Sequence, residues 1–236
     1  QGTTKRAIYV VFDNSGSMYG DGNKAWSQAT YAMEVFAAMM NYESGDVMKV
    51  FPMHDITTDG NTGSATKSSM EIRGKDDIAQ IHNMYTPKPG GTPYTQVNNA
   101  AGELTKLLNA GSVDEGWLVV LTDGDFDNDI PASGLKADLE GKAAANENLY
   151  VQYLAIGTDV KNIPEGNADK GLYAQKAGNT SEVVNELAEI SNRIFKRNEY
   201  AGYSSEDSGL EFDIPLRKLI VFAPVSYTHL TLPTIA

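Results

Sequence analysis

A carboxylate and two hydroxyls follow the first apolar stretch of the chain at regular spacing. Residues 8–12 form an apolar run that ends on Asp13, and Ser15 and Ser17 stand two and four positions further on. The last residue of a strand points out of the end of a sheet, and a tight turn through Gly16 returns both serines to the same place. These three side chains offer hard oxygen donors, and such donors suit Mg²⁺.

Two distant segments offer donors to the same place. Thr92 lies in a stiff loop, Gly-Gly-Thr-Pro, at residues 90–93, and a second apolar run at residues 118–122 ends on Asp123. In open α/β sheets, ligands bind beyond the carboxyl ends of the strands. Since Asp13 and Asp123 both end apolar runs, we expect them to lie at that edge, with the Thr92 hydroxyl nearby.

The order of these motifs resembles the von Willebrand factor A (VWA) domain family. Its metal-ion-dependent adhesion site (MIDAS) is written D-x-S-x-S, then a distant T, then a strand-terminal D. The five positions are filled without departure, by Asp13, Ser15, Ser17, Thr92 and Asp123. The resemblance covers about residues 5–198. It implies that the three hydroxyls contact the metal, while the two aspartates act directly or through waters.

The resemblance also implies a partner, because one coordination position would accept a Glu or Asp side chain from another protein. Hydroxyl ligands are neutral, so the ion keeps much of its charge until that carboxylate arrives. Mg²⁺ is the expected metal, with Mn²⁺ or Ca²⁺ as alternatives. A simpler interpretation stays open, in which Asp13 caps the following turn and Ser15 and Ser17 are ordinary turn residues.

Composition narrows the class of protein. The chain has 236 residues, of which 41% are hydrophobic, enough for a sizeable core. A net charge of −12 repels nucleic acids and anionic membrane surfaces. The absence of cysteine excludes disulfides and cysteine-based zinc sites. His54, His82 and His229 are far apart, which argues against a histidine-based zinc site. No segment reaches the roughly 20 apolar residues that span a bilayer.

Apolar runs alternate with stretches of helical periodicity, which predicts an α/β fold: an open, mostly parallel, doubly wound sheet with helices on both faces, the Rossmann-like VWA fold. The elements fall as follows: strands over 7–12, 46–53, 69–73, 117–122, 149–156 and 171–174; helices over 24–42, 75–84, 94–109, 132–148 and 181–197; and an exposed loop over 55–69. The last helix is expected to be capped by Ser181.

We expect a VWA domain over residues 1–200, a polar linker over 201–209, and the start of a truncated, β-rich domain over 210–224. Residues 225–236 resemble a translated DNA-sequencing adapter rather than native sequence; a real edge strand is the alternative. Because the chain starts at Gln1 and not at Met, we also expect an upstream segment.

An acidic run over residues 123–129 invites a calcium interpretation. It fails the EF-hand template whether started at Asp123 or at Asp125, because glycine is missing at the sixth position and glutamate at the twelfth. Asp125, Asp127 and Asp129 are therefore interpreted as a solvated acidic rim beside the main site, with a weak second cation site as the alternative.

Three functions compete. The leading hypothesis is a non-enzymatic, metal-dependent protein-binding module for adhesion or scaffolding, on a bacterial surface or outside the cell. A cytoplasmic VWA subunit that docks on an ATPase is the second. The third, a Mg²⁺-dependent phosphohydrolase of the haloacid dehalogenase type, needs an acidic residue where Ser15 stands. Partner, physiological metal and oligomeric state are not readable from the sequence.

Overall fold

The computed structural model describes residues 4–54, 56–57, 65–67, 69–74, 76–77, 80–81, 92–124, 126, 134–157 and 163–196. The predicted linker and the two segments after it, residues 201–236, lie outside this part. So do Asp125, Asp127 and Asp129 of the acidic run. None of the helices described has both the length and the apolar character needed to cross a membrane.

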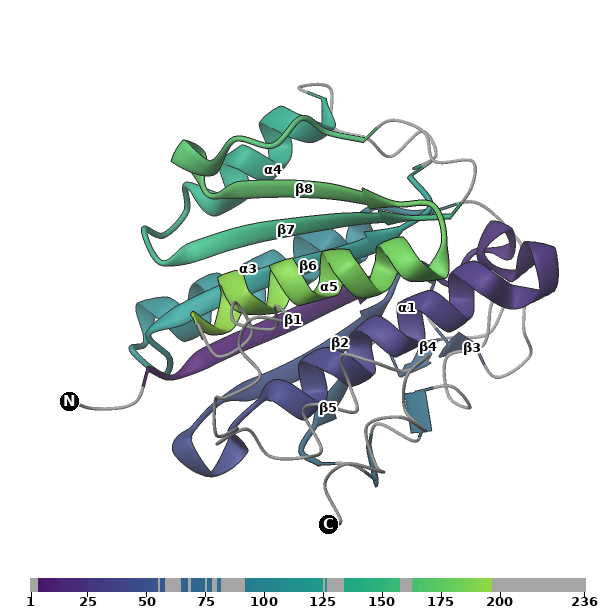
Figure 1. The fold of residues 1–236 in the computed structure, drawn as a ribbon. Coiled ribbons are helices and arrows are strands. Elements are labelled where there is room, and N and C mark those ends of the chain that lie inside the picture. Colours follow the sequence, from purple (N-terminus) through teal and green to yellow (C-terminus); the bar gives the residue numbers. More distant parts are fainter. Residues whose placement is uncertain are drawn as a thin grey trace, which may run out of the picture.

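Strands and helices alternate along the described chain (Figure 1). The strands are β1 Arg6–Phe12, β2 Val47–Pro52, β3 Ile56–Thr57, β4 Ala65–Lys67, β5 Met70–Ile72, β6 Glu115–Thr122, β7 Leu149–Ile156 and β8 Leu172–Ala177. The α-helices are α1 Gly20–Met39, α3 Thr95–Asn109, α4 Leu135–Ala143 and α5 Thr180–Phe195, and the 3₁₀ turns are η1 Gly16–Tyr19, η2 Tyr42–Ser44 and η3 Ala168–Lys170.

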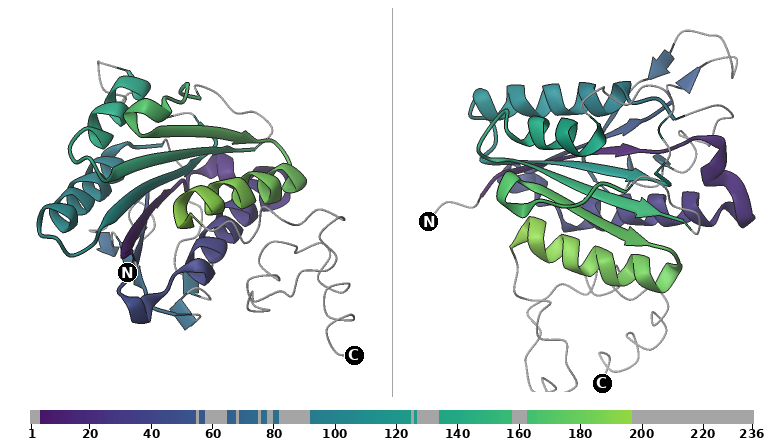
Figure 2. Two further views of the ribbon diagram at one scale, coloured as in Figure 1. Left: turned by 60° about the vertical axis from the view of Figure 1, so that its left-hand side comes forward. Right: turned by 90° about the horizontal axis from the view of Figure 1, so that it is seen from above.

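Six strands form one sheet in the order β5-β2-β1-β6-β7-β8, and every neighbouring pair is parallel except β2 and β5. Helices α1 and α5 cover one face, and α3 and α4 cover the other (Figure 2). The predicted doubly wound, mostly parallel α/β fold is therefore confirmed. A second, two-stranded ladder of β3 and β4 stands apart from this sheet.

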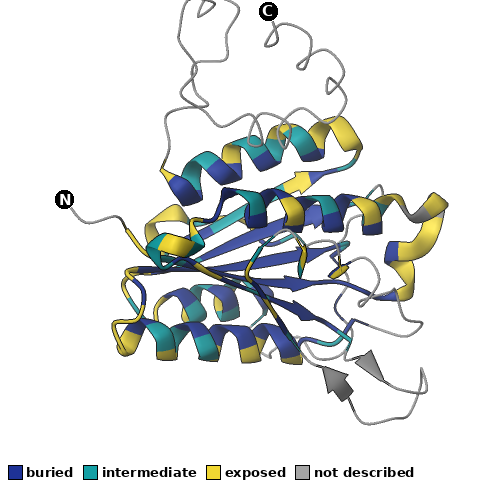
Figure 3. Ribbon diagram, turned by 90° about the horizontal axis from the view of Figure 1, so that it is seen from below, coloured by how far each residue is buried: buried dark blue, intermediate teal, exposed yellow. Residues whose placement is uncertain are grey.

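The central strands are buried on both faces, which is why they read as continuous apolar runs. All eight residues of β6 are buried, and so are six of the seven of β1. Alternate side chains enter two separate cores, one under α1 and α5 and the other under α3 and α4. The helices keep their exposed residues on the side away from the sheet (Figure 3). The two covering layers hold the carboxyl ends of the strands at one edge.

Several expected boundaries were wrong. Helix α1 begins at Gly20 instead of residue 24, because η1 leads directly into it. The last helix is capped by Asn179, not by Ser181. The Asn179 side chain accepts a hydrogen bond from Glu182 N at 2.9 Å, and asparagine is as good an N-cap as serine. Part of the expected loop over 55–69 forms the β3–β4 ladder.

Candidate metal centre

Asp13 follows β1 directly and is completely buried. Its backbone N–H donates to Leu121 O at 2.8 Å, which continues the β1–β6 ladder beyond the strand. One side-chain oxygen, Oδ1, accepts from Ser15 N at 2.8 Å, and Oδ2 accepts from the hydroxyl of Thr122 at 2.8 Å. The turn-capping role of the simpler interpretation is therefore present, but it uses only one of the two carboxylate oxygens.

Ser15 and Ser17 face each other. Their Oγ atoms lie 2.9 Å apart, although Ser15 is buried and Ser17 is exposed. Ser15 precedes η1, yet its side chain does not cap that turn. Met18 is fully buried in the core under α1, and it ties the turn to the sheet. The spacing of two residues thus brings the two hydroxyls together beside Asp13, at a point open to solvent on the Ser17 side.

Asn14 fixes the direction of this loop. Its side-chain amide makes two hydrogen bonds with the backbone of His54: Nδ2 donates to His54 O at 3.1 Å, and Oδ1 accepts from His54 N at 2.8 Å. Met53 N also donates to Phe12 O at 2.9 Å. The ends of β1 and β2 are consequently locked together, which leaves little freedom to the residues on either side of Asn14.

Thr92 is buried and precedes α3 by three residues. Gly116, near the amino end of β6, faces Leu104 and Leu108 of the second half of α3. Helix α3 therefore runs opposite to β6, and its first turn lies at the carboxyl edge of the sheet. Thr92 is placed at the same edge as Asp13.

Tyr94 connects the Thr92 segment to the segment after Asp123. Its ring packs edge-on against Phe126 with ring centres 5.1 Å apart. Its hydroxyl donates to Asp138 Oδ2 at 2.5 Å. Burial raises the pKa of Tyr94, and the hydrogen bond to Asp138 adds to the effect, so this donor stays protonated. The two loops are joined through a buried aromatic contact.

Asp123 follows β6 and is half-buried. The next residue, Gly124, has a φ of +98°, a left-handed conformation that favours glycine, and its N–H donates to Thr122 Oγ at 3.1 Å. Thr122 thus donates to Asp13 and accepts from Gly124. The sequence did not predict Thr122 or Asn14 as residues of this site. Neutral polar residues inside or beside strands follow no sequence pattern that marks them as functional.

The candidate metal ligands are mostly neutral: three are hydroxyls, and two are carboxylates. Among the residues that the structure describes, no three His, Cys, Asp or Glu side chains gather in a way that could hold a metal ion. Within the described residues, the oxygen donors at this edge are therefore the serine and threonine hydroxyls beside the two aspartates. Such hard neutral ligands suit Mg²⁺, Mn²⁺ or Ca²⁺ better than soft metals.

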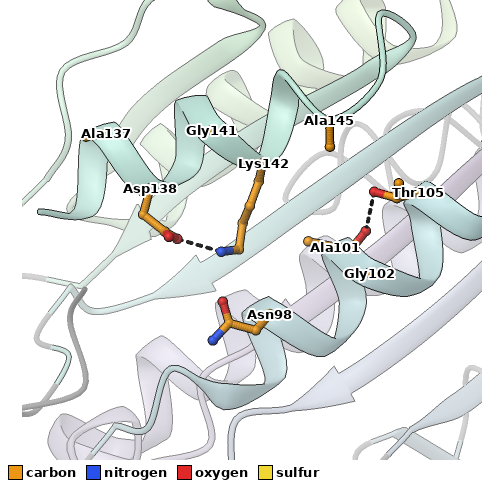
Figure 4. Close-up of a pocket in the computed structure, with 9 residues that line it drawn as sticks. All are labelled: Asn98, Ala101, Gly102, Thr105, Ala137, Asp138, Gly141, Lys142 and Ala145. Atoms are coloured by element: carbon orange, nitrogen blue, oxygen red, sulfur yellow. Dashed lines mark hydrogen bonds and ion pairs between the residues drawn. The ribbon is translucent and has the colours of Figure 1, made fainter. Parts of the chain in front are cut away.

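A groove of about 430 Å³ lies elsewhere, between α3 and α4 (Figure 4). Small residues line most of it, and Asp138 and Lys142 stand at one side, joined by an ion pair of 2.6 Å. Lys142 matches the charge of Asp138 within the protein, and the hydroxyl of Tyr94 donates to the same carboxylate. The groove adds no donor to the candidate metal centre.

The sequence matches no family model and no curated protein. Solved structures are similar in fold. The pilus adhesin SpaC from Lactobacillus rhamnosus GG has a TM-score of 0.52 and 18% identity, over 83% of this chain and 31% of that chain. Proximal thread matrix protein 1 from the mussel byssus was solved with a zinc-occupied MIDAS motif. It has a TM-score of 0.53 and 15% identity, over 83% of this chain and 49% of that chain.

The aligned region thus spans about a third of the adhesin and half of the byssus protein. Both contain VWA domains, and a likeness at this identity shows the fold. The described part of the chain has a VWA-like fold, as the order of its motifs predicted.

Proposed function

We propose that the chain is a metal-dependent protein-binding module. In this proposal, Asp13, Ser15, Ser17, Thr92 and Asp123 hold one divalent cation at the carboxyl edge of the sheet, and a Glu or Asp side chain of a partner protein completes its coordination. The hydroxyls of Ser15, Ser17 and Thr92 are the direct ligands, and the two aspartates act directly or through waters.

The burial of Asp13 without a cationic partner carries the proposal. The side chain is 0% exposed, yet no Lys, Arg or His of the described residues pairs with it. A buried carboxylate is costly unless it is paired, hydrogen-bonded or bound to a metal. Two hydrogen bonds reduce that cost, and a bound cation would remove most of the rest. The charge of Asp13 is thus available to a metal ion.

The two serine oxygens lie at a hydrogen-bond distance that is also compatible with two neighbouring ligands of Mg²⁺. Neighbouring ligands in an octahedron with Mg–O bonds of about 2.1 Å lie about 3.0 Å apart. The 2.9 Å between Ser15 Oγ and Ser17 Oγ agrees with that edge. Ca²⁺ has longer bonds of about 2.4 Å but takes six to eight ligands, so neighbouring oxygens around it can also lie this close. Mn²⁺ is close enough to Mg²⁺ in size to serve as its probe.

The same donor set explains why a partner carboxylate would bind. The three hydroxyls are neutral, so where the aspartates act through waters the bound cation keeps part of its positive charge, which attracts an acidic side chain. Ser17 is exposed, so the site is open on its side. An acidic chain with a net charge of −12 is thereby able to bind an acidic partner.

Binding accounts for the geometry better than phosphate hydrolysis does. A nucleophilic aspartate needs a carboxylate oxygen free to attack and an acid or base close by. In phosphohydrolases of the haloacid dehalogenase type that acid or base stands two residues after the nucleophile, and here this position is Ser15. We therefore propose no enzymatic activity. Docking on an ATPase uses the same five residues, and no contact in the structure favours it.

We place the module at the cell surface or outside the cell. The pilus adhesin with which it shares a fold supports this location. Surface exposure is checked by protease treatment of intact cells of the source organism, followed by detection with an antibody. Protection of the protein until the cells are lysed would favour the cytoplasmic alternative.

Calorimetric titration of Mg²⁺ and Mn²⁺ into the chain tests the metal site. Asp13→Asn and Thr92→Ala are the test variants. Asp114→Asn and Thr105→Ala are matched controls, because Asp114 bonds to Lys5 N and Thr105 to Ala101 O, both away from the site. We expect one-to-one binding in the wild type and in both controls, weakened about 100-fold in Asp13→Asn, or about 2.7 kcal/mol.

The same titration shows what would contradict the proposal. A well-folded wild-type chain that binds neither metal overturns it, and so does an Asp13→Asn variant that binds as tightly as the wild type. Circular dichroism in EDTA separates folding from function. The fold should persist without metal, because the two cores are complete without it.

A further inference from the structure

Tyr153 brings a buried hydroxyl toward the candidate metal centre from a third strand. It lies on β7 and is 0% exposed. Its neighbours in register are Val120 on β6 and Ala174 on β8, and Val120 pairs in turn with Val11 on β1. The ring belongs to the core under α3 and α4, one row behind the ends of β1 and β6.

The alternation of side chains directs this ring toward the site. Asp13 and Thr122 each stand two residues beyond Val11 and Val120, so they share the face on which Tyr153 lies. On β7 itself, the next residue on that face is Ala155, which pairs with Thr122. A methyl group leaves room above it, and a side chain in a strand leans along the strand. The register thus allows the phenol to extend over Ala155 toward Thr122 and Asp13.

Electrostatics agree with this direction. Burial is the main cause that raises the pKa of Tyr153, and the negative charges of Asp13 and Asp123 add to it. These contributions agree with a hydroxyl that faces the carboxyl edge of the sheet. It also remains protonated, so it serves as a permanent hydrogen-bond donor.

This donor has no partner among the described residues. Tyr153 Oη is buried without a hydrogen bond, whereas the hydroxyl of Tyr94 donates to Asp138 and that of Tyr42 donates to Ala37 O. Unpaired buried hydroxyls are uncommon in folded proteins, and each one points to a water or another group that belongs there. The carboxylates whose charge acts on this hydroxyl are Asp13 and Asp123 of the candidate metal centre.

We propose that Tyr153 is a positioning residue of the metal centre, whose hydroxyl donates through a buried water to the carboxylates of Asp13 and Asp123. This inference rests on the proposed function. Each oxygen of Asp13 accepts one hydrogen bond and retains a second lone pair for that water. Groups behind metal ligands orient them and raise metal affinity, and their removal commonly weakens binding 10- to 100-fold.

Tyr153→Phe removes only the hydroxyl and keeps the ring. Tyr42→Phe is the matched control, because its hydroxyl is paired at the other end of the molecule. We expect Tyr153→Phe to weaken Mg²⁺ and Mn²⁺ binding about tenfold in calorimetry. Its stability to urea in EDTA should stay equal to that of the wild type or rise. Tyr42→Phe should do the reverse, with unchanged metal affinity and reduced stability.

The two readouts separate positioning from a structural role. If Tyr153→Phe and the wild type bind metal within twofold of each other, the inference about Tyr153 is wrong while the proposed function stands. Weaker metal binding that comes with an equal loss of stability in EDTA also overturns it, since the hydroxyl would then support the fold. A wild-type chain that binds no metal overturns both.

Discussion

The two ends of the central strands each bury a carboxylate, and the partners of the two carboxylates differ in charge. At the amino end, Glu115 is 5% exposed and meets cations: Lys196 Nζ lies 2.8 Å and Arg6 Nε 3.8 Å from its oxygens, and Trp117 Nε1 donates at 2.6 Å. At the carboxyl end, Asp13 is 0% exposed, and its oxygens accept from a backbone N–H and a hydroxyl.

This difference separates a carboxylate that serves the fold from one that serves a ligand. At the amino end, Arg6 and Lys196 neutralise the charge of Glu115, so this carboxylate has no free charge to attract a ligand. Two neutral donors hold Asp13 in place, and no cationic side chain among the described residues compensates its negative charge. The presence of a buried aspartate is thus less informative than the charge of its partners.

The largest effect is expected from Glu115→Ala. The change leaves Arg6 buried without its ion-pair partner, and Lys196, held at a left-handed φ of +50°, loses its contact. We expect the free energy of unfolding to fall by about 3 kcal/mol. Urea unfolding measures this free energy, with the exposed Glu147→Ala as the control.

The metal affinity of Glu115→Ala should be unchanged, because the two ends of the strands lie roughly 20 Å apart. Weakened metal binding would show that the two ends are coupled.

Bound metal should stabilise the folded chain only through the site at the carboxyl ends of the strands. At about ten times its dissociation constant, Mg²⁺ should raise the free energy of unfolding by about 1.4 kcal/mol and the melting temperature by about 4 °C. Thermal unfolding with Mg²⁺ and with EDTA measures the shift. Glu115→Ala should keep the full increment and Asp13→Asn should lose it. An equal increment in Asp13→Asn would place the bound metal elsewhere.

The smallest difference between the two ends concerns pH, where they should behave alike. Burial is the main cause that raises the pKa of Tyr42 near the amino end and of Tyr153 near the carboxyl end. The unfolded chain releases these phenolic protons near pH 10 while the folded chain keeps them, so stability is full below pH 10 and falls above it.

The slope of that decline should be about 1.4 kcal/mol per pH unit for each such tyrosine. Urea unfolding in EDTA at half-unit steps between pH 9 and 11.5 measures it. Tyr42→Phe and Tyr153→Phe should each flatten the slope by the same amount. A flatter slope in only one variant would mean that burial does not dominate at both ends.

The layered fold was predictable because its signals are local. Strands buried on both faces must be continuously apolar, and each helix that covers them repeats its apolar residues every three or four positions. Helix ends were predicted less well. The acceptable caps Asn179 and Ser181 lie two residues apart, and only the backbone decides between them. The short β3–β4 ladder was missed inside a polar segment.

The sequence by itself determined the strand-end aspartates and the serine pair, because alternation along a strand and a turn of fixed length place Asp13, Ser15 and Ser17 without help from the rest of the chain. Tertiary structure alone decided which neutral groups support them. Thr122 is 109 residues from Asp13, and their contact exists because β1 and β6 pair in one register. Asn14 meets His54, and Tyr153 approaches the same edge, for the same reason: hydrogen bonds between strands depend on register, and no local pattern in the sequence encodes it.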